Sequence, residues 1–310
     1  MQIKVLGSAA GGGFPQWNCN GSMSARVRAG EAGLTARTQS SMIVSADGQR
    51  WVLLNASPDL RQQINETPEL WPAKVAGLRS SPIEAAVLTN GDVDHIIGLI
   101  NLREGQAFKL YGSQRVLDTL SANSVFNVLN PDHVERRALP MDEALELTGA
   151  SGGLGLSFEA FTVPGKVALY LEKTDGTANF GTEDGDTIGL KITDTAKQQS
   201  FYYIPGCARI DDRLADRLRG ADLVFFDGTL FTDTEMIDQG LSHKTGARMG
   251  HMSMSGPDGS MAAFEVLDVK QRVFVHINNS NPVLDDNSAE RRQVTEAGWI
   301  VAHDGMEFSL

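Results

Sequence analysis

The stretch that decides the fold is Ala85–Arg103, AAVLTNGDVDHIIGLINLR. Its first apolar run, Ala85–Leu88, is typical of a buried strand, and an amphipathic helical pattern follows over His95–Arg103. Open α/β sheets build their sites at the carboxyl ends of strands, so the polar turn between the two is expected to carry chemistry. Asp94 and His95 are adjacent there and can converge on one ion. Helix capping would explain one aspartate, but not the histidine that follows it.

Two later apolar runs also end on side chains that bind metals. Asp227 directly follows the run Leu223–Phe226, and His276 is the last residue of the run Arg272–His276. A carboxylate at the end of a buried strand is costly unless it is paired or bound to a metal. Capping or packing roles remain the simpler interpretation of each residue alone. Together with Asp94 and His95, they predict a metal site.

The remaining pattern predicts the architecture. The chain has 310 residues, of which 41% are apolar and 21% charged, as in ordinary globular proteins. Strands and helices alternate in the first half, and the middle is rich in consecutive strands, as in hairpins. We therefore expect an α/β fold with two sheets covered by helices, an αββα sandwich, in a single domain over residues 1–310. The expected strands include Ser157–Val163, Ala168–Glu172 and Ser200–Ile204, and Thr174–Asp186 is expected to be a loop.

Composition also limits location and partners. The net charge of −12 would repel nucleic acid. The chain has no apolar run long enough for membrane insertion and no signal-peptide pattern, so a cytoplasmic location is expected. Cys19 and Cys207 are not expected to pair there. Gly7–Gly13 is not interpreted as a nucleotide loop, because Phe14 and Pro15 follow where a helix would have to start.

Taken together, these residues resemble the metallo-β-lactamase superfamily, whose signature is His-x-His-x-Asp-His followed by a later His, Asp and His. Members usually hold two metals. Here Asn90 and Asp92 stand at the two leading His positions, and Val163–Lys166 stands where the mid-chain His would be. The resemblance therefore implies that the first site is lost. It implies one metal in the second site, held by Asp94, His95, Asp227 and His276.

Several longer sequence segments resemble one family within this superfamily, the pyrroloquinoline quinone (PQQ) biosynthesis protein B family. This resemblance extends over nearly the whole chain. The segments are Gly7–Cys19, Ala36–Ser41, Asn55–Asp59, Gly98–Glu104 and Val275–Leu284. That family often carries Cys-x-Cys-x-x-Cys, suited to a structural zinc. Here Gly21 and Ser24 replace two of the cysteines, and one thiolate cannot hold zinc alone. No structural zinc is expected.

The resemblance implies oxidative chemistry on a small peptide or amino-acid-derived substrate, the tyrosine of a Glu-Tyr unit. Two histidines with a carboxylate suit Fe(II), with O2 as co-substrate, although zinc or manganese would also fit. His251 would move protons, and Asp92 would orient a ligand or accept the phenol proton. The substrate carboxylates would pair with Lys244, Arg248 or Arg209.

Two other functions stay open. The lost first site would suit a non-catalytic carrier that helps PQQ or its precursor reach the periplasm. A metal-dependent hydrolase is the third possibility, although a single metal weakens it because no hydroxide is bridged. Other PQQ biosynthesis proteins and a second copy of the chain, in a homodimer, are the macromolecular partners considered.

Overall fold

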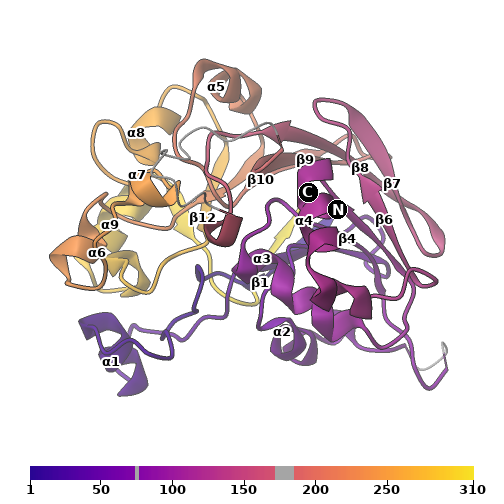
Figure 1. Ribbon diagram of the computed structural model, residues 1–310. Coiled ribbons are helices and arrows are strands. Elements are labelled where there is room, and N and C mark those ends of the chain that lie inside the picture. Colours follow the sequence, from indigo (N-terminus) through magenta and orange to yellow (C-terminus); the bar gives the residue numbers. More distant parts are fainter. Residues whose placement is uncertain (74–76, 172–184) are drawn as a thin grey trace.

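Two seven-stranded sheets form the framework of the computed structural model, which describes residues 1–73, 77–171 and 185–310 (Figure 1). Most of the predicted loop Thr174–Asp186 lies outside the described residues. The strands of the first sheet are, in spatial order, β14 (Glu307–Ser309), β1 (Gln2–Gly7), β2 (Ser41–Ser45), β3 (Trp51–Leu54), β4 (Ile83–Val87), β5 (Phe108–Gly112) and β6 (Val134–Ala138). Those of the second are β13 (Trp299–Val301), β12 (Gln271–Val275), β11 (Leu223–Asp227), β10 (Ser200–Ile204), β9 (Ile188–Asp194), β8 (Gly152–Thr162) and β7 (Ala144–Gly149).

Each sheet is antiparallel in one half and parallel in the other. Strands β3 to β6 run parallel, as do β10 to β13, and the remaining neighbours are antiparallel. Parallel strands need crossover connections, which here place helices on the sheet faces. The polar turns that follow β4, β11 and β12 therefore all leave the carboxyl ends of parallel strands.

Helices cover the outer faces of both sheets. The α-helices are α1 (Ser22–Arg28), α2 (Leu60–Glu66), α3 (Val93–Ile96), α4 (Gln114–Ala122), α5 (Asp212–Leu218), α6 (Glu235–Asp238), α7 (Gly246–Met249), α8 (Ser260–Phe264) and α9 (Ala289–Glu296). Short 3-10 helices are η1 (Pro68–Leu70), η3 (Ile97–Leu102), η4 (Ser124–Val128), η5 (Leu169–Leu171) and η6 (Pro282–Leu284). No helix among the described residues has both the length and the apolar character that crossing a bilayer requires.

The apolar core has three layers. The central one fills the space between the sheets, where Val44 of the first sheet and Phe158 and Phe225 of the second are fully buried. The second packs the helices α5, α8 and α9 on one sheet, and the third packs α2 and α4 on the other. This layering confirms the predicted αββα sandwich.

Some local predictions were wrong. The expected strand Ala168–Glu172 contains η5 in its described part, and the expected helix His95–Arg103 is mostly the 3-10 helix η3. The strand β6 was missed because it lies at the edge of its sheet. Its exposed Arg and Glu side chains hide the alternation that marks a half-buried strand.

Candidate metal centre

The candidate centre lies where the two sheets bring their strand ends together. Asp94 and His95 belong to α3, which begins directly after the turn that leaves β4. Asp227 is the last residue of β11 and is paired in register with Val275, so His276 follows at the same edge. His276 adopts a left-handed backbone with φ of 57°, which turns the chain sharply at the site.

Two overlapping groups of potential ligands share His276. Asp94, His95 and His276 form one group, and Asp227, His251 and His276 form the other; in each group the ligand atoms lie within 4.8 Å of one another. His276 Nε2 is 3.1 Å from Asp94 Oδ2. Three of the four predicted ligands thus meet in one group, while Asp227 groups with His251. The site is a His/Asp metal site.

His95 carries the clearest sign that a metal belongs here. Its Nδ1 lies 2.8 Å from Asn90 Oδ1, an atom that only accepts, so Nδ1 carries the proton. The Nε2 atom is then a bare lone pair, and it is buried with no hydrogen-bond partner in the described part of the chain. Buried polar atoms are rarely left unpaired. A metal ion would satisfy this nitrogen, and the residues present fit one.

Thr229 connects Asp227 with His276. Its hydroxyl lies 2.6 Å from Asp227 Oδ1 and donates to it, because a carboxylate only accepts. The same oxygen therefore accepts from His276 Nδ1, 2.8 Å away, which leaves His276 Nε2 directed at Asp94. Asp227 Oδ2 accepts from His251 Nδ1 at 2.6 Å and from the backbone of Cys207 at 2.9 Å. His251 thus keeps Nε2 for exchange with a molecule in the site.

Burial and charge set the protonation of these groups. Burial lowers the pKa of His95 to about 4, so its imidazole is neutral at pH 7, the form that binds metals. Burial raises the pKa of Asp94, but His95 and His276 outweigh it and hold that pKa below its ordinary value. Burial and the nearby Asp94 raise the pKa of Asp92. Burial lowers the pKa of His276, but its hydrogen bond to Asp94 outweighs it, so the net shift is upward.

The comparisons with known proteins agree with this geometry. Residues 50–277 match the model of the β-lactamase superfamily domain. Coenzyme PQQ synthesis protein B from Xanthomonas axonopodis is 52% identical over the whole of both chains. The crystal structure of Zn2+-bound PqqB from Methylobacterium extorquens is 49% identical, covers both chains completely and has a TM-score of 0.94.

This chain belongs to the coenzyme PQQ synthesis protein B family.

The predicted family and superfamily are therefore confirmed. A diphosphatase of the PhnP family, 24% identical with a TM-score of 0.68 over all of this chain and 97% of its own, shares the fold. The PqqB structure from Methylobacterium extorquens holds zinc, and zinc was among the metals expected for this set of ligands. Cys19 belongs to neither ligand group found in the described residues, and its Sγ accepts from Gly21 N at 3.3 Å.

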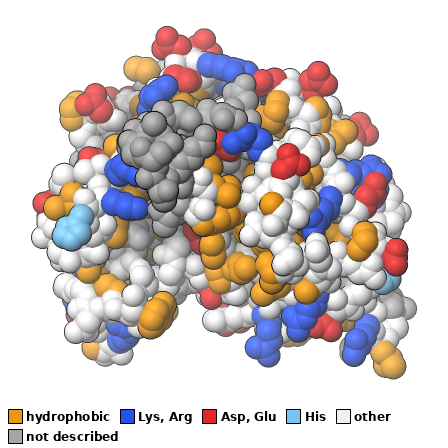
Figure 2. Space-filling view, in the orientation of Figure 1, with side chains coloured by type: hydrophobic (Ala, Val, Ile, Leu, Met, Phe, Trp, Pro, Cys, Tyr) orange, Lys and Arg blue, Asp and Glu red, His pale blue; other side chains and the backbone are white. Residues whose placement is uncertain are grey.

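A cavity of about 360 Å³ opens onto the ligands. Figure 2 shows one face of the molecule, on which hydrophobic side chains gather near the middle. The lining residues are Ala10, Gly11, Gln16, Asn90, Asp92, Asp94, His95, Lys166, Gly206, Thr229, Met236, Lys244, Met249, His251, His276 and Asn278. The glycine-rich loop passes close to the site, since a Cβ on Gly11 would lie 3.3 Å from Asp94 Oδ2.

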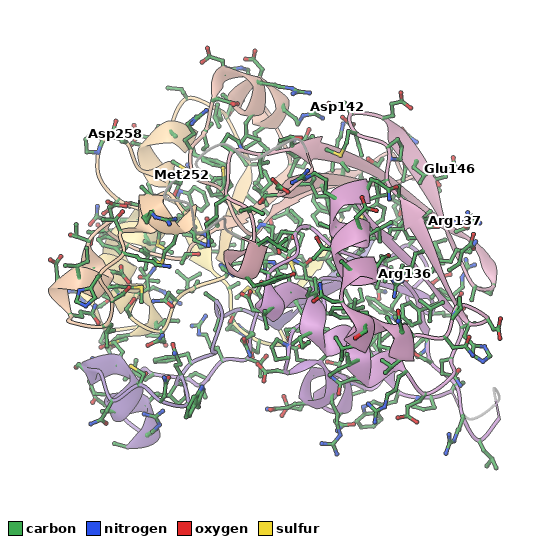
Figure 3. All side chains as sticks on the ribbon, viewed as in Figure 1. Arg136, Arg137, Asp142, Glu146, Met252 and Asp258 are labelled. Carbon is green, nitrogen blue, oxygen red and sulfur yellow. The ribbon has the colours of Figure 1, made fainter. Side chains whose placement is uncertain are left out.

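The predicted substrate-binding residues divide into two kinds. Lys244 lines the cavity, whereas Arg248 and Arg209 are absent from its described lining. Figure 3 places the basic pair Arg136 and Arg137 of β6 at the opposite side of the molecule from Met252, which follows His251. Among the described residues, the Lys and Arg side chains that line the cavity are Lys166 and Lys244.

Sequence reasoning missed several residues of the site. Lys166 and Asn90 were noted as replacements for lost ligands, with no role of their own. Thr229 and Asn278 were not singled out, although each follows a strand-terminal ligand by two residues. Polar residues just beyond such strand ends were the signal that could have found them.

Proposed function

We propose that the protein is an Fe(II)- and O2-dependent hydroxylase of the tyrosine moiety of a Glu-Tyr precursor in PQQ biosynthesis. The observation that carries this proposal is the ligand group Asp94, His95 and His276. Two imidazoles and one carboxylate, with other positions open, are the pattern of non-haem iron oxygenases. Membership of the family supports the pathway.

The residues of the site have separate tasks in this proposal. Asp94, His95 and His276 would hold the iron, with Asp227 within reach as a further ligand, and the bound iron would supply the activation of O2. His251 moves a proton at Nε2, because Asp227 holds its Nδ1 proton. Asp92, whose pKa burial raises, lines the cavity and accepts the phenol proton.

Charge at the cavity would select and orient the substrate. Lys244 and Lys166 line it and attract the carboxylates of a Glu-Tyr unit. Arg248 and Arg209, which were expected to share this task, are absent from the described lining. We therefore expect Lys244 substitutions to raise KM more than Arg209 substitutions do.

Anaerobic reconstitution tests the proposal. Protein loaded with Fe(II) is mixed with Glu-Tyr peptide, O2 and a two-electron reductant, and the product is analysed by mass spectrometry. One oxygen atom should enter the ring, while the other leaves as water with two electrons and two protons. His251→Gln should slow turnover by about 100-fold or more without loss of iron. A full iron site with bound peptide and no oxygenated product would overturn the proposal.

A hydrolase is the second candidate, because the related crystal structure holds zinc and zinc activates water. Peptide cleavage by zinc-loaded protein without O2 would establish it. The carrier function would be favoured instead by tight quinone binding that survives His276→Ala.

A further inference from the structure

A relay of hydrogen bonds runs from a buried carboxylate to the cavity. Glu235 begins α6 and is buried; its Oε2 accepts from the backbone N–H of Phe231 at 2.6 Å and of Thr232 at 3.3 Å. Its Oε1 is 2.6 Å from Ser280 Oγ. Ser280 Oγ is in turn 2.5 Å from Asn278 Nδ2.

The carboxylate decides the direction of every bond in the relay. An ionised carboxylate only accepts, so the single Ser280 hydroxyl proton must be donated to Glu235. The Ser280 oxygen must then accept, and only the NH2 end of the Asn278 amide can donate to it. The oxygen and nitrogen ends of an amide are otherwise hard to tell apart, but here the buried Glu235 carboxylate decides which end of Asn278 is the nitrogen.

The result is a hydrogen-bond acceptor on a residue that lines the metal-centre cavity. Asn278 lines that cavity, and its backbone N–H donates to Thr229 O at 3.0 Å, beside the ligands. With Nδ2 bound to Ser280, the Oδ1 atom is the amide's remaining end. Asn279 Nδ2 meets it at 3.5 Å, the outer limit of a hydrogen bond, so Oδ1 can accept from another donor.

We propose that Asn278 Oδ1 binds the amino group of the substrate and that Glu235, acting through Ser280, is the positioning residue that turns this oxygen toward the cavity. The inference rests on the proposed function, because it names the part of a Glu-Tyr substrate that is recognised. Lysines at the cavity bind its carboxylates, and the asparagine binds its nitrogen. A molecule with the carboxylates but no amino group would lose this bond.

Two ligands that differ in that group provide the test. Glu-Tyr and glutaryl-Tyr, which lacks the amino group, are titrated into zinc-loaded protein by calorimetry without O2, at about pH 8, where Glu235 is a carboxylate. Wild type should bind Glu-Tyr about tenfold more tightly. Asn278→Ala should abolish the preference. Glu235→Gln should abolish or invert it, because the new amide donates to Ser280 and reverses the Asn278 side chain.

The control keeps the same surroundings. Gln239→Ala removes a bond to the backbone oxygen of Ser280, outside the relay, and should keep the preference. If Glu235→Gln does not fold, Ser280→Ala breaks the relay at its centre and should also remove the preference. A folded Glu235→Gln protein that keeps the wild-type preference would overturn the proposal, as would failure of wild type to bind Glu-Tyr. Absence of hydroxylation beside an intact preference would count against the proposed function alone.

Discussion

At the scale of single residues, each histidine of the centre has its Nδ1 atom paired with an oxygen. Asn90 Oδ1 holds His95, and Thr229 Oγ1 holds His276. Such partners set which nitrogen carries the proton and how the ring points, and they raise the basicity of the other nitrogen. Asn90, at a position where the superfamily resemblance implies a ligand, therefore orients the neighbouring His95.

Loss of that partner should weaken metal binding. Asn90→Ala removes the acceptor for His95 Nδ1, and we expect zinc affinity to fall by about 10- to 100-fold. Competition with a chromophoric chelator measures the dissociation constant. Asn65→Ala, on an exposed part of α2, is the control and should bind as wild type does. Unchanged affinity in Asn90→Ala would show that the ring is held by packing alone.

Glu235 should leave a signature in the pH dependence of stability. Burial raises its pKa to about 7, so the folded state binds this proton more tightly than the unfolded state. The resulting stabilisation is complete below the unfolded pKa of about 4.3 and is lost as pH rises through about 7, an effect on the order of 3 kcal/mol. Urea unfolding of wild type and Glu235→Gln between about pH 4 and pH 8 measures this contribution of Glu235 to the free energy of unfolding. Parallel profiles for the two proteins would contradict it.

At the scale of elements, the turn after β4 is held by close backbone contact. Ala56 N donates to His95 O at 2.7 Å, and Gly98 N donates to Ala56 O at 2.9 Å, so α3 and η3 lie directly on the loop that follows β3. This approach requires glycine: a Cβ at Gly98 would lie 2.0 Å from Ser57 O. The position of His95 therefore depends on a residue that touches no metal.

Gly98→Ala should consequently damage both stability and metal binding. The obstructing atoms are backbone and cannot move aside cheaply, so we expect a loss of about 3 kcal/mol or more in unfolding free energy. Thermal melts and zinc titrations measure the two effects. Gly153→Ala in β8 is the matched control, because a Cβ there has nothing within 4 Å and should change stability by less than about 0.5 kcal/mol. Equal melting temperatures for the two variants would disprove the contact.

At the scale of the whole molecule, the centre joins the two sheets. Asp94 and His95 come from the end of the first sheet, and His276 comes from the end of the second. A metal bound by all three therefore links the halves of the sandwich, and its binding energy adds to the stability of their packing.

Metal removal should therefore lower the melting temperature of the entire fold. At free zinc about 100 times the dissociation constant, the added stability should be about 2.7 kcal/mol. Differential scanning fluorimetry across a series of zinc concentrations measures it. His276→Ala should melt at a temperature that zinc no longer changes, whereas the exposed His133→Ala should respond as wild type does. A zinc-dependent shift that persists in His276→Ala would place the bound metal elsewhere.

The sequence predicted the sandwich and the grouping of Asp94, His95 and His276, because both follow from local order. Apolar runs mark strands: Asp227 ends one, His276 directly follows another, and Asp94 and His95 follow the polar turn after a third. Their meeting required no knowledge of long-range contacts beyond the rule that parallel strands gather their carboxyl ends at one edge. Strand β6 was not predicted, because an exposed edge strand lacks the apolar alternation that marks a half-buried strand.

The amino-acid sequence by itself determined which residue types end the strands, and hence the chemistry that can occur. Only the tertiary structure decided how Asp227 and the cavity lysines group. Asp227 forms a hydrogen bond with His251. Lys166, which is far from Lys244 in the sequence, lines the same cavity as Lys244. It also decided that Glu235 and Ser280 orient Asn278. These relations depend on distances across two sheets and on the direction of hydrogen bonds, which no periodicity along the chain encodes.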